Sequence, residues 1–371
     1  MAENNLVVTV SPHIKSPHTT RSVMSVVVAA LLPATLWSFV VFGTAALSVV
    51  SISVVTALFC EVIWHNLRTG KGVARTWLAL AVSLAVPAAG SAAGLGALVV
   101  PVATVVFMAA FVFSEAGLER HGEKRHVFDG SAAVTGLLLA LVLPPVVPWW
   151  IPFIGSFVAI SLGKEIFGGL GFNVFNPALV ARAILVLSWP VYLTRGWFKP
   201  LVVDATSKAT PLTAIKEGTL AGLSRFYWPL FFNNPGGCIG EVSAFLLILG
   251  GAFLLLCTVI TWEIPVTYLG TMAVFSLLAG QDPVFHLLAG GAVVGALFMA
   301  TDYVTSPITS KGKIVFGVTC GLITMMLRLY SKSPEGVTSA ILFMNMLTPL
   351  IDRSLMPRPF GVKRAARGVR K

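Results

Sequence analysis

The polar stretch from Asp204 to Leu212 is the part of the chain whose residue types and surroundings indicate cofactor chemistry. It combines several hydroxyl side chains with one lysine, and it lies in the longest weakly hydrophobic segment between the first and last apolar runs, residues 194–241. In a chain this hydrophobic, such a long polar interruption is where water, and therefore a charged cofactor, can reach the protein. We expect the rest of the chain to hold this stretch at one face of a bilayer.

Acidic side chains within or at the ends of apolar segments form a second set. An acid at the bilayer centre costs about 2.5–3.5 kcal/mol on insertion scales, so such residues usually face a cavity or a partner. Their oxygens suit sodium ions or a proton path. Glu61, Asp302 and Asp352 are the candidate cation path, with interfacial capping or ion pairing as the alternative for each. The full set is Glu61, Glu165, Glu241, Glu263, Asp302 and Asp352.

Cysteines, histidines and glycine-rich stretches give weaker signals. The four cysteines are far apart and show no C-x-x-C spacing, and no histidine has ligand spacing with them, so the sequence predicts no metal site. The stretches 168–171 and 235–237 follow no strand of a βαβ unit, which excludes a Rossmann phosphate loop. We expect close helix packing or tight turns there, with approach to a flavin as the alternative.

The composition indicates which kind of protein positions these residues. Of 371 residues, 56% are hydrophobic and only 11% are charged, whereas a soluble domain carries about 25% charged residues. Apolar runs of about 17–25 residues recur, which is the length that crosses a hydrocarbon core of about 30 Å. The net charge of +11 comes largely from short loops and the tail, where basic residues retain cytoplasmic segments beside anionic lipid. The sequence therefore predicts an all-α polytopic membrane protein in a lipid bilayer and no nucleic-acid partner.

The order of apolar and polar segments predicts five regions. They are a polar cytoplasmic leader without a cleavable signal peptide (1–21), a first membrane repeat (22–192), an extracytoplasmic loop (193–241), a second membrane repeat (242–352) and a basic cytoplasmic tail (353–371). About ten transmembrane helices plus two half-helices are expected, the half-helices being the short, Pro- or Gly-flanked segments near 131–147 and 337–352. The twelve apolar segments are 22–42, 45–64, 76–92, 95–113, 131–147, 149–163, 176–192, 242–258, 264–280, 284–300, 314–328 and 337–352.

A weak internal sequence similarity favours a two-repeat architecture. Asp129-Gly130-Ser131 is followed by Asn176-Pro177 much as Asp302 is followed by Asn345. Paired repeats often place a functional site between them. Chance similarity among membrane helices that contain Gly and Pro is the alternative.

Several further motifs are too specific for generic membrane helices. In chain order they are Ser11-Pro12-His13-Ile14, 129–136 with Leu143-Pro144-Pro145, 164–178 (KEIFGGLGFNVFNPA), 207–212 (SKATPL), Gly240-Glu241-Val242-Ser243, 298–302 (FMATD) and Pro334-Glu335-Gly336 leading into Met344-Asn345. Together they resemble the D subunit of the Rnf complex, an ion-translocating electron-transport assembly that works between ferredoxin and NAD. The B subunit of the sodium-pumping NADH:quinone oxidoreductase is the nearest alternative relative. The resemblance covers roughly residues 10–353.

The resemblance implies a flavin site in the polar stretch. In that family a threonine ending a Ser/Thr-Gly-Ala-Thr motif carries FMN through a phosphoester bond made by a separate flavin transferase. Here the motif is Ser207-Lys208-Ala209-Thr210, so Thr210 is the implied acceptor, and Asp204 and Ser207 match upstream motif positions. Lys208 replaces the usual glycine. If that backbone needs a positive φ, lysine costs on the order of 1 kcal/mol; a lysine could instead pair with the flavin phosphate.

The resemblance also implies a non-covalent riboflavin, which the sequence does not place, and a role in a larger assembly. The chain would carry electrons between ferredoxin and NAD with coupled Na+ or H+ translocation, together with the other Rnf subunits, in the bacterial cytoplasmic (inner) membrane. It would not be catalytic alone, because it has neither a nicotinamide site nor an iron–sulfur cysteine set. A solute channel or secondary transporter without a redox role is the alternative function. A purely structural subunit that has lost its cofactor is a further alternative.

Sidedness is predicted from the parity of the spans. With both termini cytoplasmic, an odd number of spans before residue 194 places Thr210 outside, as in the family. The excess of basic residues in the loop opposes the positive-inside rule. Loop charge is weaker evidence for sidedness when cofactors and partner subunits hold the loop, so we keep the outside placement.

Overall fold

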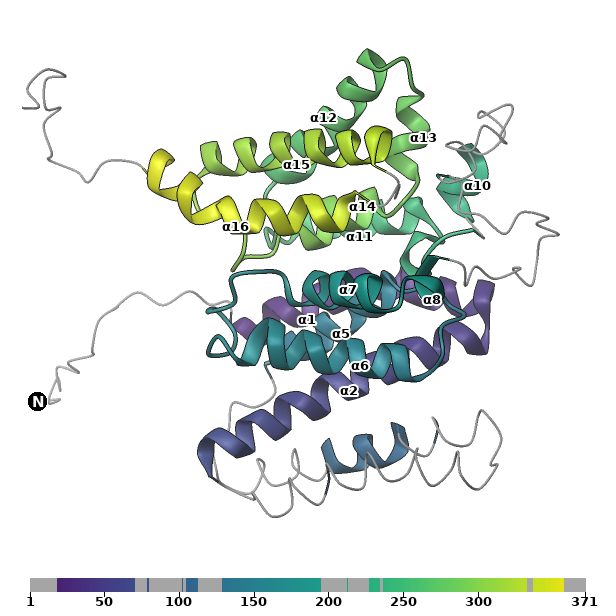
Figure 1. Cartoon of the computed structure of the whole chain (residues 1–371), viewed down its shortest axis with the longest axis vertical. Coiled ribbons are helices and arrows are strands. Elements are labelled where there is room, and N and C mark those ends of the chain that lie inside the picture. Colours follow the sequence, from purple (N-terminus) through teal and green to yellow (C-terminus); the bar gives the residue numbers. More distant parts are fainter. Residues whose placement is uncertain are drawn as a thin grey trace, which may run out of the picture.

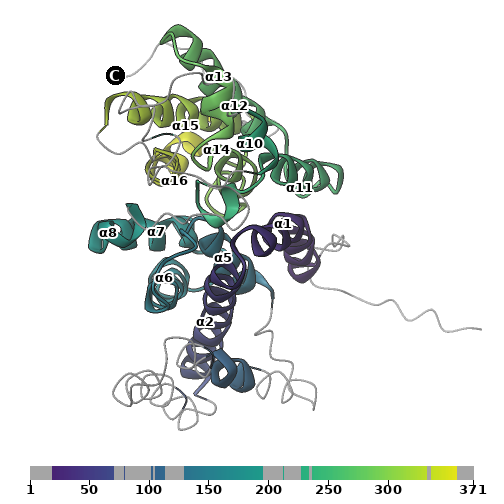
Figure 2. The same ribbon diagram turned by 90° about the vertical axis from the view of Figure 1, so that its right-hand side faces the viewer.

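A computed structural model of the chain describes residues 19–70, 79, 102, 105–112, 129–194, 212, 227–233, 236–331 and 336–356. The regular elements of these residues are helices, and no strand occurs among them, which confirms the all-α prediction. Most helices run side by side in two groups, α1 to α8 and α10 to α16 (Figure 1). Viewed from the side, the groups meet where α1 lies beside α11 (Figure 2). We call them the first and second half.

The first half begins with two long apolar helices. Helix α1 (Thr20–Phe42) starts where the Thr19 hydroxyl accepts a hydrogen bond from Ser22 N at 3.2 Å, and it ends at Gly43, whose φ is 61°. Helix α2 (Thr44–Thr69) ends at Gly70, which adopts the left-handed conformation that glycine tolerates best. Each is long enough to cross a membrane, as is α15 (Ser310–Tyr330) in the second half.

The rest of the first half is made of shorter elements. Helix α5 (Ser131–Leu141) has 11 residues and is therefore about 16 Å long, too short to cross a bilayer. Its length agrees with a half-helix. The predicted segment 131–147, however, is helical only as far as Leu141. The remaining elements are α6 (Trp150–Ile160), the π-helical segment η1 (Ser161–Glu165), α7 (Pro177–Ser188) and α8 (Pro190–Thr194).

The second half also contains an interrupted helix. The predicted span 284–300 is divided into α13 (Pro283–Leu288), α14 (Ala292–Val294) and a second π-helical segment, η4 (Gly295–Met299). The expected half-helix at 337–352 corresponds to α16 (Val337–Leu355), a continuous helix of 19 residues that runs through Pro349 and is not among the described helices apolar enough to cross a membrane. The other elements are α10 (Tyr227–Phe232), the 3₁₀ turn η3 (Ile239–Glu241), α11 (Ala244–Leu256) and α12 (Glu263–Leu278).

Glycines bring several helix backbones into close contact. Gly317 and Gly321 are four residues apart on α15, and a Cβ at Gly321 would fall 2.5 Å from the carbonyl oxygen of Tyr268 on α12. Between the halves, a Cβ at Gly250 on α11 would fall 2.3 Å from the carbonyl oxygen of Ala30 on α1. Small residues at such positions allow the van der Waals packing that holds membrane helices together.

The described ends of the chain lie on one side of the helices. Thr20 begins α1 at the same end of the molecule where α16 finishes, whereas α8 and α10, which flank the long polar loop, lie at the other end (Figure 1). This arrangement agrees with termini on one side and the loop on the other. The number of ten spans is untested, since most of the predicted segments 76–92 and 95–113 lie outside the described residues.

Candidate functional site

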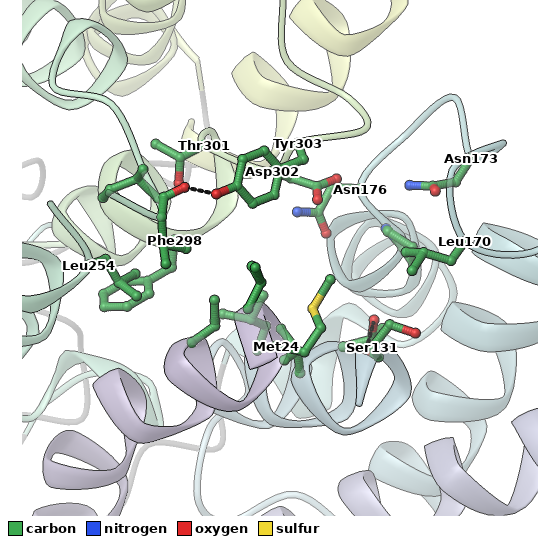
Figure 3. A pocket seen from close by; sticks show the side chains of 18 of the residues that line it. Met24, Ser131, Leu170, Asn173, Asn176, Leu254, Phe298, Thr301, Asp302 and Tyr303 are labelled. Atoms are coloured by element: carbon green, nitrogen blue, oxygen red, sulfur yellow. Dashed lines mark hydrogen bonds between the residues drawn. The ribbon is translucent and has the colours of Figure 1, made fainter. Parts of the chain in front are cut away.

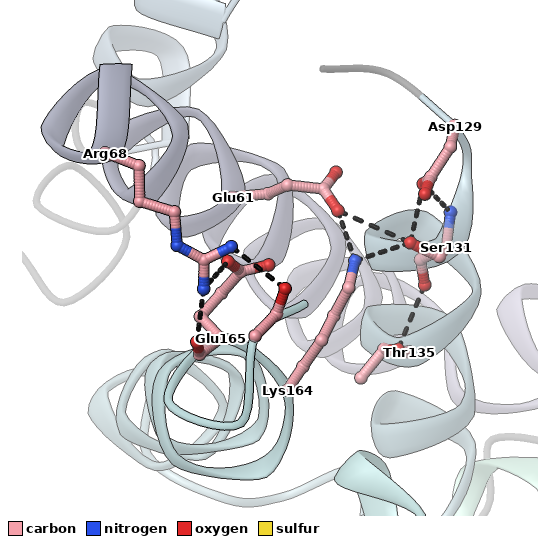
Figure 4. Close-up of polar contacts among 8 residues, drawn as sticks. Glu61, Arg68, Asp129, Ser131, Thr135, Lys164 and Glu165 are labelled. Carbon is pink, nitrogen blue, oxygen red and sulfur yellow. Dashed lines mark hydrogen bonds and ion pairs between the residues drawn. The ribbon is translucent and has the colours of Figure 1, made fainter. Parts of the chain in front are cut away.

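A buried charged cluster occupies the first half near the end of α2. Lys164 of η1 donates hydrogen bonds to Glu61 Oε1 on α2 and to Ser131 Oγ at the start of α5. Ser131 Oγ lies 2.6 Å from Asp129 Oδ1, which also accepts a 2.8 Å bond from Ser131 N. Figure 4 shows the Lys164 ammonium between the two helices that carry Glu61 and Ser131. Lys164 is 3% exposed and Glu61 7%, so this ion pair is buried.

A second ion pair closes the end of the cluster. Arg68, at the end of α2, pairs with Glu165 Oε2 at 3.0 Å and also donates to the carbonyls of Glu165 and Gly168 (Figure 4). Its side chain is 42% exposed. A polar cavity adjoins both pairs, and its lining consists of Glu61, His65, Arg68, Asp129, Lys164, Glu165 and residues 168–170.

The π-helical segment explains how neighbouring residues serve the two pairs. A π-helical turn holds more than four residues and is frequent at functional sites. Lys164 and Glu165 are adjacent in η1, yet the lysine pairs with Glu61 and the glutamate with Arg68. Gly163 makes room for this segment, because a Cβ there would lie 2.8 Å from Pro177 Cα on α7.

A largely apolar cavity lies where the halves meet. Its walls come from α1, α5 and the loop before α7 in the first half, and from α11, η4 and residues 301–303 in the second (Figure 3). Lys164 and Leu170 line this cavity as well as the polar one. Its polar atoms come from Lys164, Ser131, Thr135, Asn173, Asn176, Thr301, Asp302 and Tyr303.

Asn173 and Asn176 supply the amides of this cavity. Asn176 caps α7 by accepting from Ala178 N and Leu179 N, and its Nδ2 donates to Met299 O in the other half at 3.2 Å. Its backbone N–H donates to the side chain of Asn345 at 3.1 Å when that amide is oriented to suit both neighbours. Asn173 Oδ1 is buried with no hydrogen-bond partner among the described residues.

Asp302 and Asp352, predicted with Glu61 as a candidate cation path, each bond to the loop between η4 and α15. Asp302 Oδ2 accepts from Thr305 Oγ1 at 3.0 Å, and Asp352 Oδ1 accepts from Ile308 N at 3.0 Å, so both hold the loop between η4 and α15. Protein packed around the Asp302 carboxyl raises its pKa above the ordinary value of aspartate. Asp302 lines the cavity between the halves, whereas Glu61 is separated from that cavity by Lys164.

Two buried arginines bind the backbone where the short helices end. Arg182 of α7 donates to the carbonyl of Val142, just after α5. Arg328 of α15 donates to the carbonyl of His286 in α13 and to those of Ala289 and Gly290 just after it. Such bonds satisfy carbonyls that a broken helix would leave without partners.

Described parts of the long polar loop contact the chain at both places where a short helix ends, after α5 and after α13. We call these two places the first and the second break. Ile239 N donates to Leu143 O at 3.0 Å. Leu212 is 6% exposed and packs with Leu230, Phe285 and Ala289. A Cβ at Gly290 would lie 2.1 Å from Leu212 Cδ1, so Leu212 is seated directly on the second break.

The predicted flavin residues lie outside the described residues. These are Asp204, Ser207, Lys208, Ala209 and Thr210. All four cysteines are described and free, and three are buried. No group of three or more His, Cys, Asp or Glu side chains in the described ranges could hold a metal ion.

Sequence reasoning missed the basic partners of the site. Lys164, Arg182 and Arg328 each lie in an apolar segment or at its end, and each proves to be buried and bonded to a glutamate or a backbone carbonyl. The rule that intramembrane charges need partners applies to cations as well as to acids, and it would have singled them out.

These features define a multi-pass helical membrane protein with interrupted helices and a cavity between two halves. The sequence profile of the NQR2, RnfD, RnfE family matches residues 7–77 and 70–361. The chain belongs to this family.

Three relatives illustrate the similarity. The chain is 41% identical to the D subunit of the Na(+)-translocating ferredoxin:NAD(+) oxidoreductase complex of Acetobacterium woodii, over 98% of this chain and 97% of that protein. It is 46% identical to the D subunit of the proton-translocating ferredoxin:NAD(+) oxidoreductase complex of Clostridium ljungdahlii, over 64% of this chain and 76% of the relative. The D subunit of an ion-translocating oxidoreductase complex from Stutzerimonas stutzeri is 41% identical over 66% of this chain and 78% of its own length.

Proposed function

We propose that the chain is the flavin-carrying membrane subunit of an ion-translocating complex that passes electrons between ferredoxin and NAD. The observation that carries this proposal is the full-length similarity to the D subunit of such a complex. The other subunits of the complex supply the nicotinamide and iron–sulfur sites, and the complex resides in the bacterial cytoplasmic membrane. The named relatives translocate Na+ in one case and protons in another, so the similarity supports ion coupling without selecting the ion.

Covalent FMN on Thr210 is the first part of the proposal. It rests on the motif Ser207-Lys208-Ala209-Thr210 and on a flavin transferase that acts on this chain. Leu212, two residues later, is anchored over the second helix break beside Gly290 and Arg328. A buried anchor this close in sequence suits an acceptor segment that must meet a transferase and afterwards hold its cofactor in one place.

A non-covalent flavin in the cavity between the halves is the second part. An isoalloxazine ring is flat and largely apolar, with an N–H donor and carbonyl acceptors along one edge. The cavity offers apolar walls and includes the amide residues Asn173 and Asn176 in its lining, so the residues fit the group. Asn176 and Lys164 supply donors on the same wall.

A bound flavin would supply electron transfer in one- or two-electron steps. The residues of this chain would bind and orient the ring, exclude water from it and place charges beside it. Lys164 is the cation that lines the cavity, and Asp302 is the acid there. Both charges can therefore respond electrostatically to a change of charge in the cavity.

The test is in-gel fluorescence of the denatured chain under ultraviolet light, after co-expression with a flavin transferase. The wild type is expected to give a bright band, Thr210→Ala a dark one, and the nearby control Thr206→Ala a bright one. A dark wild-type band contradicts the covalent flavin and favours a structural subunit without cofactor. For the second flavin, Asn173→Leu is expected to remove extractable riboflavin from the native complex while leaving the covalent band bright.

A solute channel or secondary transporter is the second candidate, because interrupted helices around a cavity also suit a solute path. A chain that shows no flavin fluorescence but releases a trapped solute from liposomes would support it. A bright band lost only in Thr210→Ala would exclude it, since a pore has no use for a flavin acceptor.

A further inference from the structure

A further cavity of about 220 Å³ opens between the halves, toward the end of the molecule that carries the long polar loop. Arg182 and Leu187 of α7 line it from the first half. From the second half, Ser331 lines it just after α15, and Thr338 and Ser339 line it in the first turn of α16. Figures 1 and 2 both show α7 beside α16, and the two helices are in contact. The cavity is therefore a crevice to which both halves contribute.

The polar side chains of this crevice are one cation and three hydroxyl groups. Arg182 is only 8% exposed and brings a positive charge to the crevice. Ser331, Thr338 and Ser339 bring hydroxyl donors, and no acid occurs among the described residues that line it. The planar fork of a guanidinium matches the oxygens of a phosphate group, and hydroxyls donate to such oxygens as well. The crevice thus has the chemistry of a phosphate site.

Apolar surface leads away from the crevice along α16. Phe343, Met346 and Leu350 are exposed on this helix. They follow Ser339 at steps of four, three and four residues, so they lie on one face and form a stripe that begins at the crevice. From Ser339 to Leu350 the helix rises about 16 Å, and half of a hydrocarbon core is about 15 Å thick. Leu187, which borders the crevice on α7, is 82% exposed. A polar crevice followed by an apolar stripe of this length fits one phospholipid molecule.

The charge of the crevice selects among possible occupants. The ammonium of a zwitterionic headgroup needs an acidic partner, and the described lining offers none. An anionic headgroup brings only a negative charge, which is favourable beside Arg182 where water is scarce. A transmembrane helix of a partner subunit could cover the stripe, but acids are rare within such helices. An anionic phospholipid such as phosphatidylglycerol therefore fits best.

We propose that the crevice binds the phosphate of one anionic phospholipid and that this lipid joins the two halves. Arg182 contacts the phosphate from the first half and the hydroxyls of Thr338 and Ser339 contact it from the second, while an acyl chain lies along the stripe of α16. Arg182 also donates to the carbonyl of Val142 at the first break. A guanidinium has five N–H donors, so this one side chain holds the break and the lipid together. The inference goes beyond the proposed function and needs no flavin.

The experiment uses the whole complex that contains this chain, stripped of lipid in dodecyl maltoside and titrated with phosphatidylglycerol. Native mass spectrometry counts the bound lipid. Ser339→Glu places an acid where it competes with the phosphate for Arg182, and is expected to weaken the binding of one phosphatidylglycerol about tenfold or more. Thr338→Val removes one hydroxyl donor and should weaken it about fivefold. Phosphatidylethanolamine should bind the wild type about tenfold more weakly than phosphatidylglycerol, and inorganic phosphate should not displace the lipid.

Matched controls separate this site from lipid bound elsewhere on the complex. Ser354→Glu adds the same charge at an exposed position at the other end of α16 and is expected to bind phosphatidylglycerol as the wild type does. Arg182→Lys keeps the positive charge but loses the fork, and should weaken binding about fivefold. If Arg182→Lys does not assemble, Ser339→Glu and Thr338→Val still test the site.

Three results would overturn the inference. Equal binding of phosphatidylglycerol in the wild type and Ser339→Glu is one, and it is also the outcome if a partner subunit covers the stripe. Equal affinity of the wild type for phosphatidylethanolamine is the second, because the charge is then not recognised. Displacement of the lipid by inorganic phosphate is the third, because the site then takes free phosphate. The proposed function fails separately, since the flavin band of Ser339→Glu on a gel should be as bright as that of the wild type.

Discussion

In the first half, α5 ends at Leu141 and the chain turns through Leu143-Pro144-Pro145 before α6 begins. In the second half, α13 ends at Leu288 and the chain turns through Ala289-Gly290-Gly291 before α14. Proline breaks the first helix by removing a backbone donor. Two glycines with φ near 67° break the second by adopting a conformation that other residues avoid.

The two breaks are stabilised in the same way and used differently. At each break a buried arginine donates hydrogen bonds to backbone carbonyls, and a residue of the long polar loop contacts the backbone. Each is followed by a π-helical segment, but η1 contains Lys164 and Glu165 whereas η4 is apolar throughout, Gly295–Met299. The first half therefore carries the two ion pairs of the candidate site. The second half supplies Asp302 and an apolar wall of the cavity, and it holds Leu212 against the second break.

The arginines give the largest predicted effect. Arg328→Met leaves two buried carbonyls and one half-buried carbonyl without their arginine donor, at a cost on the order of 3 kcal/mol or more. Arg182→Met removes the donor to one carbonyl and should cost about 1–3 kcal/mol. Melting of the detergent-solubilised protein, followed by tryptophan fluorescence, measures both. Arg353→Met, an exposed arginine at the end of α16, is the control and should melt like the wild type. Equal losses for Arg182→Met and Arg328→Met would show that the breaks do not differ in this respect.

Contact between the halves is tested by a single added methyl group. Gly250→Ala places a Cβ 2.3 Å from the Ala30 carbonyl oxygen, so α1 and α11 must separate, at about 1–3 kcal/mol. Gly270→Ala is the matched control, since a Cβ there meets nothing within 4 Å. It should be neutral or stabilising by up to about 1 kcal/mol, because alanine is the better helix former. Thermal melting compares the two, and an unchanged Gly250→Ala would mean that the halves are not held by this contact.

Asn176 joins the halves through hydrogen bonds, and its removal should have a smaller effect. Asn176→Ala removes the cap of α7 and the bond to Met299 O, together about 2 kcal/mol. Ser243→Ala removes only the cap of α11 and a long bond within the second half, and should cost about 1 kcal/mol. A double-mutant cycle with Asn345→Ala measures the coupling across the boundary. Strict additivity would place the two asparagines outside a common network.

The sequence predicts the long helices well because their signal is local. The runs 22–42 and 314–328 become α1 (Thr20–Phe42) and α15 (Ser310–Tyr330), with boundaries shifted by a few residues. The run 337–352 becomes α16 (Val337–Leu355), which is a few residues longer than the predicted segment and tolerates Pro349 near its end. The break at 289–291 was missed because apolar residues continue on both sides of it.

The candidate site was predictable only in part. Glu61 was identified because an acid in an apolar run needs a partner. That partner, Lys164, is 103 residues away, and local patterns cannot pair residues over that distance. Asp302 and Asp352 were likewise identified as acids, but their joint hold on the loop around Ile308 depends on how α16 packs against its neighbours. The spatial arrangement of the halves, and not the residue types, decides which acids share a cavity.

Asp302 gives the smallest effect, and one that depends on pH. Burial raises the pKa of this carboxyl in the folded protein above its unfolded value, so the folded state binds the proton more tightly. The stabilisation from that proton is complete below the ordinary aspartate pKa, near 3.9, and is lost as the pH rises through the raised value. Asp302→Asn removes the ionisable group while keeping an acceptor for Thr305, so it should melt above the wild type at neutral pH. The difference should vanish at the acid end, where both side chains are neutral. Asp352→Asn is the control on the same loop. An Asp302→Asn protein that melts at or below the wild type at neutral pH would mean that a nearby positive charge, with the Lys164 ammonium as the candidate, already balances this carboxylate in the cavity.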